Sequence, residues 1–356
     1  MRIGLCGLSK VGKTCVFEAV SGQCVQAHPH APNLAAVAVP DERLDRLFNE
    51  SQRPKKVQVK IEYLDPYAPE TGAEDALTPY LNAVKGAPVL ALVVRGFENP
   101  NVPHVHGCID MQRDINDFVA KTLERDIATC ERRIERIDVM YRKAKSQELE
   151  RERDVIVKCL SHLRCSEPLQ RLALRPEEQE AIKSIEFFTA KPLLIVLNVD
   201  EKDAATARLD TITAEFRRTA PGYATVTALC ARLERELLEL CDDDRLMFMG
   251  EMCLSCLAQE RIIKASFEAT ETICFYTIGD DEVRAWPLKT GASAVEAAGA
   301  VHTDMARGFI RAEVLAFNDY LKAGSMREAK AQKLVRLEGK EYLVADGDII
   351  QLRFHV

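Results

Sequence analysis

An eight-residue segment near the start of the chain, GLSKVGKT at residues 7–14, limits most strongly what this sequence can fold into. It contains Gly7, Gly12, Lys13 and Thr14 at fixed spacing, between a short apolar run and a helical pattern. Glycines let the backbone curl so that successive amide N–H groups point inward and form an anion site at a helix N-terminus. The segment therefore predicts a phosphate loop, in which Lys13 reaches the β- and γ-phosphates of a nucleoside triphosphate and Thr14 binds Mg²⁺.

The phosphate loop also predicts which residues contact the nucleotide. Backbone N–H groups and the lysine ammonium surround the phosphates in such loops, and the threonine hydroxyl binds the metal. An ordinary glycine turn would not explain the adjacent lysine and threonine. The expected phosphate and Mg²⁺ contacts are Lys10, Val11, Gly12, Lys13, Thr14 and Cys15.

The composition is ordinary for a globular protein and argues against several functions. The formal net charge of −7 argues against a protein that coats nucleic acid with its whole surface. No apolar run approaches the ~18 residues needed to span a bilayer, and a phosphate-loop strand at the N-terminus leaves no room for a signal peptide. The 12 cysteines show no disulfide-like framework, so we expect a cytoplasmic protein with no membrane partner.

Four short, strongly apolar runs predict buried parallel strands. They lie at residues 57–65, 88–97, 191–200 and 223–231, and helical patterns separate most of them, so the predicted fold class is α/β. Ligands bind beyond the carboxyl ends of such strands. The candidate site residues at these ends are Asp65, 95–97, 198–201 and 230–232.

A charged, helical segment at residues 110–187 interrupts the strand pattern. Its apolar residues follow a coiled-coil seam, and a basic turn reverses the chain, so we predict an inserted antiparallel helical hairpin. Residues 132–145 hold six basic and two acidic side chains, which form either a solvated face or a docking arm for an acidic or RNA-rich partner. The seam residues are Leu123, Ile127, Cys130, Ile134, Ile137 and Tyr141, with Ile156, Leu160 and Leu163 on the returning helix.

The last part of the chain changes from helical to alternating patterns. Alternating strands around one helical piece predict a small β-grasp module of roughly 80 residues. The predicted organisation is a nucleotide-binding domain at 1–109 and 188–271, a coiled-coil insertion at 110–187, and a β-grasp domain at 272–356.

Several motifs make the chain resemble the Obg-like ATPase (YchF) family of translation-factor-class P-loop NTPases. They are GLSKVGKT, VPDERLDRL at 39–47, VVRGFENPNVPHVHG at 93–107, EEQEAIKSIEFFTAKP at 177–192, NVDE at 198–201, and EVRAWPLKTGASAVEAAGAVHTDMARGFIRAEV at 282–314. The resemblance implies a P-loop G domain with a coiled-coil insertion and a C-terminal TGS domain. It also implies ATP in preference to GTP, and association with ribosomes or ribosomal RNA; no DNA partner is expected.

The residues at 198–201 bear on which base is bound. A GTPase normally reads guanine with Asn-Lys-x-Asp, whereas this chain has Asn198, Val199, Asp200 and Glu201. The longer side chain of Glu201 places its carboxylate at a different distance from the base than an aspartate would. The guanine N–H donors then stay unpaired, at a cost of ~1–3 kcal/mol, which favours ATP over GTP. The resemblance adds Phe97, either a ring stacked on the base or a core residue, and Cys230 and Ala231, which would contact the base through backbone groups.

The residues that sense the γ-phosphate depart from the family pattern. No Ser or Thr lies between Gly22 and Glu50, where switch I normally supplies a threonine. Switch II normally has Asp-x-x-Gly; here Asp65 could still hold Mg²⁺, but Pro66, Tyr67, Ala68 and Pro69 follow without a glycine. By resemblance, His104 takes the place of the usual glutamine in hydrolysis.

We therefore expect an ATP-binding switch that binds Mg²⁺ and hydrolyses ATP to ADP and phosphate slowly, in association with ribosomes. The alternative is a pseudo-NTPase adaptor, in which nucleotide is structural and the coiled coil and TGS domain bind ribosome or RNA. Two His-x-His pairs, at residues 28–30 and 104–106, could bind metal, but no cysteine or carboxylate lies at ligand spacing, so we expect no site there.

Overall fold

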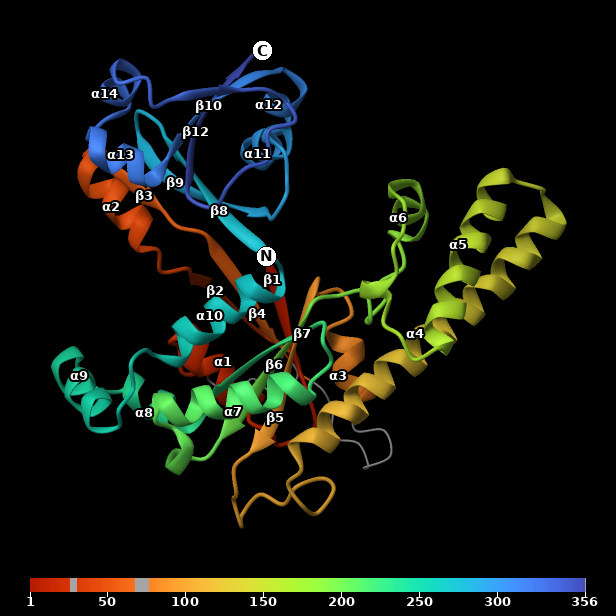
Figure 1. Ribbon diagram of the computed structural model, residues 1–356. Helices are drawn as coiled ribbons and strands as arrows, with labels where there is room; N and C mark the ends of the chain where they lie inside the picture. Colours follow the sequence, from red (N-terminus) through yellow and green to blue (C-terminus); the bar gives the residue numbers. More distant parts are fainter. Residues whose placement is uncertain (26–30, 68–76, 356) are drawn as a thin grey trace. The chain divides into compact units, whose positions relative to one another are not determined.

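The computed structural model describes residues 1–25, 31–67 and 77–355 (Figure 1). The chain divides into two compact units. The first contains Met1–Ala35 and Glu62–Ala265, and the second contains Ala36–Ile61 and Ser266–Val356. No helix in the described part of the chain is both long and apolar enough to span a membrane.

The first unit is built on a sheet with the strand order β2-β4-β1-β5-β6-β7. Neighbouring strands from β4 to β7 run parallel, and β5 and β6 are almost wholly buried, as their apolar sequences predict. The predicted α/β class is therefore confirmed. The strands are β1 (Arg2–Cys6), β2 (Asn33–Ala38), β4 (Lys60–Asp65), β5 (Val89–Gly96), β6 (Leu193–Val199) and β7 (Ala224–Leu229).

Helices connect these strands. The phosphate loop follows β1 and leads directly into α1 (Lys13–Ser21), whose N-cap Gly12 has left-handed backbone angles. The remaining connecting helices are α3 (Thr78–Ala83), α6 (Pro176–Ile182), α7 (Thr206–Thr219), α8 (Ala231–Leu238), α9 (Asp242–Glu251) and α10 (Ala258–Ala269).

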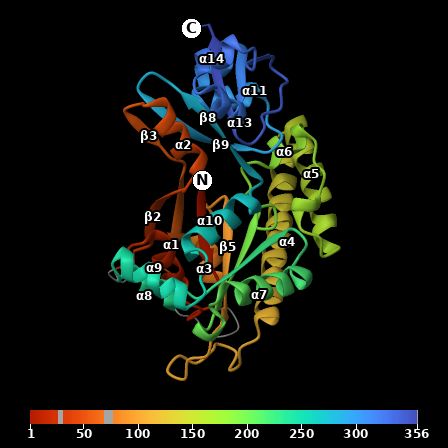
Figure 2. The same cartoon turned by 60° about the vertical axis from the view of Figure 1, so that its left-hand side comes forward.

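The predicted hairpin is present as α4 (Met111–Lys143) and α5 (Gln147–Arg164), which run side by side in Figures 1 and 2. Its seam is buried as the spacing predicts, with Cys130, Ile137 and Ile156 fully covered. One buried carboxylate fixes α4 to the segment before β6. Asp126 accepts the backbone N–H of Phe188 (3.0 Å), and both the N–H and the hydroxyl of Thr189 (2.7 Å each).

The second unit contains a sheet with the strand order β11-β10-β12-β8-β9-β3. Its core packs the small helix α11 against the strands through Ala294, Ala297, Phe275 and Val314. The C-terminal elements are β8 (Thr272–Ile278), β9 (Glu282–Lys289), α11 (Ala294–Val301), α12 (Thr303–Arg307), β10 (Phe309–Ala316), α13 (Phe317–Ala323), α14 (Met326–Ala331), β11 (Arg336–Glu338) and β12 (Asp348–Phe354).

Residues 36–61 differ from the predicted organisation. We placed them in the nucleotide-binding domain, but α2 (Glu42–Ser51) and β3 (Lys55–Val57) pack in the second unit. Figure 2 shows both elements in orange beside the blue strands of that unit. The reason is long-range pairing: β3 pairs in parallel with β9, and Arg43 forms an ion pair with Asp346 at 2.7 Å. The run at 57–65, predicted as one strand, is therefore divided between the two sheets.

Candidate nucleotide site

The phosphate loop has a backbone that only glycine fits at two positions. Gly7 has φ 136°, and a Cβ there would lie 2.4 Å from the carbonyl oxygen of Val93. Gly12 has φ 89°, and a Cβ there would lie 2.4 Å from Nδ2 of Asn198. Such contacts are too short for any side chain, so the loop can pass this close to β5 and β6 only with glycines.

Lys13 lies under this loop with its side chain buried. Its ammonium donates to the carbonyl oxygens of Leu8 (2.6 Å) and Gly7 (3.2 Å) and lies 3.7 Å from the centre of the Tyr80 ring. Burial lowers the pKa of Lys13 to about 8, although Asp65 opposes this shift. Because these acceptors are neutral, a phosphate anion would favour the charged ammonium more strongly than they do.

The two predicted metal ligands lie together. The hydroxyl of Thr14 donates to Oδ2 of Asp65 at 2.8 Å. Asn33, at the start of β2, donates from Nδ2 to the same oxygen at 3.1 Å. Hydroxyl and carboxylate oxygens are suitable Mg²⁺ ligands, so the donor set fits that ion. The sequence analysis missed Asn33; its only signal was a polar amide before the apolar run LAAVAV.

The switch regions are described only in part. Asp65, Pro66 and Tyr67 are placed, and the chain offers no glycine N–H there. Ala68 and Pro69 lie outside the described residues, as do His28 and His30.

Asn198 connects the phosphate loop with the base end of the site. Its side chain is 4% exposed, donates from Nδ2 to the carbonyl oxygen of Val11 (3.1 Å) and accepts the N–H of Ala231 on Oδ1 (3.0 Å). The amide thus joins the end of β6 to the phosphate loop and to the first residue of α8. The end of β6 and the start of α8 are two of the strand-end segments predicted to contribute to the site.

The predicted base contacts Val199, Glu201 and Cys230 differ in how far they are exposed and in which groups they contact. Val199 is only 3% exposed and belongs to the core, so its side chain is not available to a ligand. Glu201 is partly exposed, and its Oε1 lies 2.9 Å from Nε of Arg232. Cys230 is buried at the N-cap of α8, and burial raises the pKa of its thiol to about 11, so it remains a neutral thiol.

Phe97 lies beside the phosphate loop and is held by Arg95, a buried arginine from the same predicted strand end. A Cβ on Gly12 would lie 3.8 Å from the Phe97 ring. Arg95 is 2% exposed; it donates from Nε to the carbonyl of Phe97 (3.1 Å) and from Nη2 to that of Val102 (2.8 Å). Its guanidinium lies 4.6 Å from the Phe97 ring centre. Arg95 therefore fixes the start of the loop that contains His104.

His104 is held away from solvent by contacts to both ring nitrogens. The N–H of His106 donates to Nδ1 (3.1 Å), so a neutral ring has its proton on Nε2, which lies 3.0 Å from Oδ2 of Asp114. The His104 side chain is 4% exposed, and burial lowers its pKa while Asp114 raises it. In this arrangement neither nitrogen is available to a water molecule.

The carboxylates near the second histidine pair correct one expectation. We expected none at ligand spacing, but His106, Asp114 and Asp117 place their ligand atoms within 4.8 Å of one another. Both oxygens of Asp114 are already engaged, one by His104 and the other by Arg113 at 2.9 Å. The cluster is therefore an internal hydrogen-bond network in this structure.

Known relatives match the whole chain. The YchF-GTPase_C family model, described as a protein of unknown function (DUF933), matches residues 272–355. The ribosome-binding ATPase YchF of Bacillus subtilis is 35% identical over 365 residues, covering 100% of both chains. The protein of the same name from Escherichia coli O157:H7 is 33% identical over 366 residues, covering 100% of this chain and 99% of the relative.

Solved structures agree with this assignment. The YchF GTPase of Schizosaccharomyces pombe matches with a TM-score of 0.79 and 25% identity, over 99% of this chain and 97% of that chain. A GTP-binding protein from Pyrococcus horikoshii OT3 matches over 100% of both chains with a TM-score of 0.60, and at 16% identity it shows a shared fold only. The fold and the resemblance inferred from the sequence motifs are thus confirmed, and the chain belongs to the YchF family.

Proposed function

We propose that this protein binds ATP with Mg²⁺, hydrolyses it slowly and associates with ribosomes in the cytoplasm. The observation that supports nucleotide binding best is the link made by Asn198 between the phosphate loop and the N-terminus of α8. The relatives named above as ribosome-binding ATPases support the partner and the nucleotide. Lys13 would bind the β- and γ-phosphates, and Thr14 and Asp65 would hold the Mg²⁺, which neutralises phosphate charge when bound.

The preference for ATP rests on the acceptor that guanine needs. Guanine offers two N–H donors that a GTPase pairs with a carboxylate, and the only acid at the family position is Glu201. That carboxylate is engaged by Arg232, and Val199 provides no lysine to cover the base. Adenine has no need of the carboxylate, because it can be held by stacking on Phe97 and by backbone groups near Cys230 and Ala231.

Slow turnover follows from the position of His104. Phosphoryl transfer depends on correctly placed groups that orient water and stabilise charge. His104 is buried on Asp114, and switch II has no glycine to contact the γ-phosphate. Nucleotide binding without rapid hydrolysis is the expected basal behaviour, which also favours the adaptor as the second candidate function.

Calorimetric titration of ATP and GTP with Mg²⁺, alongside a phosphate-release assay, tests this proposal. We expect ATP to bind at least about tenfold more tightly than GTP, a difference of ~1.4 kcal/mol. A Lys13→Ala variant serves as the control without the phosphate ligand. Release no faster than in that variant would favour the adaptor, and a tenfold preference for GTP would contradict the base assignment. Co-sedimentation with ribosomes, with and without ATP, tests the partner.

A further inference from the structure

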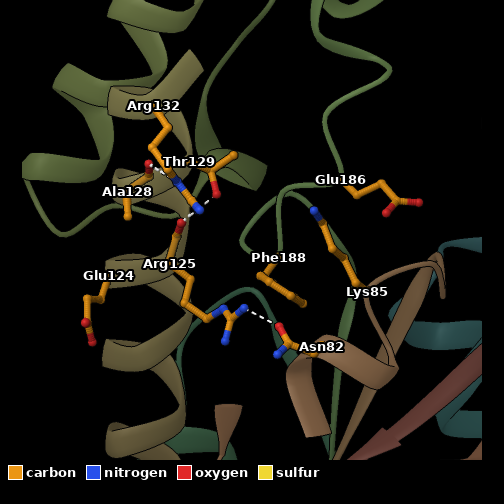
Figure 3. A pocket seen from close by; sticks show the side chains of 9 residues that line it. All are labelled: Asn82, Lys85, Glu124, Arg125, Ala128, Thr129, Arg132, Glu186 and Phe188. Carbon is orange, nitrogen blue, oxygen red and sulfur yellow. Dashed lines mark hydrogen bonds between the residues drawn. The ribbon is translucent and has the colours of Figure 1, made fainter. Parts of the chain in front are cut away.

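A pocket lies at the base of the helical hairpin, and none of its lining residues is among the predicted nucleotide contacts. It has a volume of about 340 Å³ and opens between α4, the end of α3 and the segment before β6 (Figure 3). This volume is at the lower end of the range for small-molecule sites. Its lining residues are Asn82, Lys85, Glu124, Arg125, Ala128, Thr129, Arg132, Glu186 and Phe188.

The charges around this pocket are not balanced. Lys85, Arg125 and Arg132 have no carboxylate within 4.0 Å in the described part of the chain. By contrast, Arg133 and Arg153 on the same hairpin form ion pairs at 2.7 Å with Glu152 and Asp138. The unpaired cations are notable because the whole chain has a net charge of −7.

The acidic residues of the lining form no ion pair with these three cations among the described residues. In Figure 3 the carboxylates of Glu124 and Glu186 point away from the space between α4 and Lys85. A fourth cation lies close by: Lys191 donates to the carbonyl oxygen of Lys85, and its ammonium is 5.5 Å from the centre of the Phe188 ring. Burial lowers the pKa of Lys191, Glu186 and Asp126 oppose this shift, and the charge of Lys85 adds to it.

Hydrogen bonds hold part of this arrangement in place. Arg125 donates to Oδ1 of Asn82, and its guanidinium lies 5.6 Å from the Phe188 ring centre. Arg132 is fixed to its own helix by an Nε–H bond to the carbonyl of Ala128 at 3.0 Å. Among the described residues, no hydrogen bond is present for Nη1 of Arg125 or for either terminal nitrogen of Arg132. The guanidinium groups of Arg125 and Arg132 thus both have N–H donors available at the opening of the pocket.

We propose that this pocket binds the phosphate group of a small phosphorylated ligand. Planar guanidinium groups bind phosphate through paired, charge-assisted hydrogen bonds, and an ammonium such as that of Lys85 adds a point charge. A phosphate bound here contacts α4 and the residues after α3 together, so it joins the hairpin to the nucleotide-binding unit. The pocket is distinct from the phosphate loop, because no residue of that loop lines it.

The test is a calorimetric titration of inorganic pyrophosphate into the full chain carrying Lys13→Ala, which removes the phosphate loop as a competing site. Adding Arg125→Gln and Arg132→Gln should weaken the remaining binding at least about tenfold, because each lost bond to a charged group is substantial. Adding Arg136→Gln instead should change it less than about twofold. Arg136 is the matched control, an exposed arginine on the same helix that does not line the pocket.

Three outcomes would overturn the proposal. One is the absence of pyrophosphate binding to the Lys13→Ala chain at millimolar concentration, and another is an equal loss in the Arg136→Gln chain. The third is binding of a single-stranded oligoribonucleotide that depends on Arg125 and Arg132 while pyrophosphate does not bind, which would assign the pocket to RNA. Circular dichroism verifies that each variant is folded, and Lys85→Gln, at an exposed residue, is the substitute if the double arginine change unfolds the chain.

Discussion

Replacing Asn198 by Asp should loosen the phosphate loop while leaving the shape of the side chain almost unchanged. The new carboxylate can still accept the N–H of Ala231, which Oδ1 accepts now at 3.0 Å. It cannot donate to the carbonyl of Val11, which Nδ2 now reaches at 3.1 Å. Two oxygens would then face each other in a buried place, and Val11 would move away.

The magnitude follows from the burial of this contact. A buried acceptor left without its donor costs ~1–3 kcal/mol, and repulsion from the new charge adds to that cost. Part of the cost falls on folding and part on nucleotide binding, since Val11 belongs to the loop that holds the phosphates. We expect the dissociation constant of ATP to rise about 10- to 100-fold, which corresponds to ~1.4–2.7 kcal/mol.

Calorimetry with ATP and Mg²⁺, paired with urea unfolding of the free protein, measures the two parts separately. Asn318→Asp, an exposed asparagine of the second unit, provides the same change in charge away from the site and should leave ATP affinity within about twofold. A lower free energy of unfolding in Asn198→Asp, with ATP affinity equal to that of the wild type, would contradict a role of Asn198 in nucleotide binding. Asn198 would then be only a structural residue.

The remaining predictions concern charge and burial. Asp126→Ala should lower the free energy of unfolding by ~3–5 kcal/mol in urea titrations, because three buried donors lose their acceptor; a loss below ~1 kcal/mol would contradict this. Burial raises the pKa of Glu234 from its ordinary 4.5 to about 7, so its contribution to stability is present below pH 4.5 and is lost as pH rises to about 7. Glu234→Gln should remove that loss and raise the free energy of unfolding at pH 8 by up to ~3 kcal/mol. Urea titrations of both proteins at several pH values measure this difference. Phosphate favours the charged form of Lys13, whose pKa is about 8 without ligand, so ATP affinity measured by calorimetry should fall as pH rises above 8. Asp114→Ala should free His104 and raise the rate of phosphate release, and the rise should vanish when His104→Ala is added.

The sequence predicted those features that depend on local pattern. The phosphate loop is a contiguous motif, and strands such as β5 and β6 are apolar throughout because helices cover a parallel sheet on both faces. The hairpin followed from a regular seam that ends in a basic turn. In each case neighbouring residues contain the whole signal, so no long-range contact had to be known.

Features that depend on distant contacts were missed. Residues 36–61 join the second unit because β3 pairs with β9, which lies more than 200 residues later in the chain. The amino-acid sequence of β3 does not specify that partner. Asn33 reaches Asp65 only once β2 lies in the sheet beside β4. Arg95 was predicted among the strand-end site residues, but its burial was not, because that burial depends on the loop after β5, which folds back over the side chain.

Helix α4 holds His104 through Asp114 and also forms one half of the hairpin. The proposed hydrolysis and the hairpin are therefore connected through one helix. Asp114 lies in the first turns of α4, the pocket arginines lie near its middle, and its last residue is Lys143. At 1.5 Å per residue, its 33 residues extend over about 50 Å in one element. A partner that favours a different position of α4 would move Asp114 without contacting the nucleotide, and His104 would lose the acceptor that keeps its Nε2 occupied. Because ligands shift an equilibrium only by binding its states unequally, such a partner would have to bind more tightly to the form with His104 released. Under the function proposed above, slow basal hydrolysis and stimulation through the hairpin would therefore be two consequences of the same His104–Asp114 hydrogen bond.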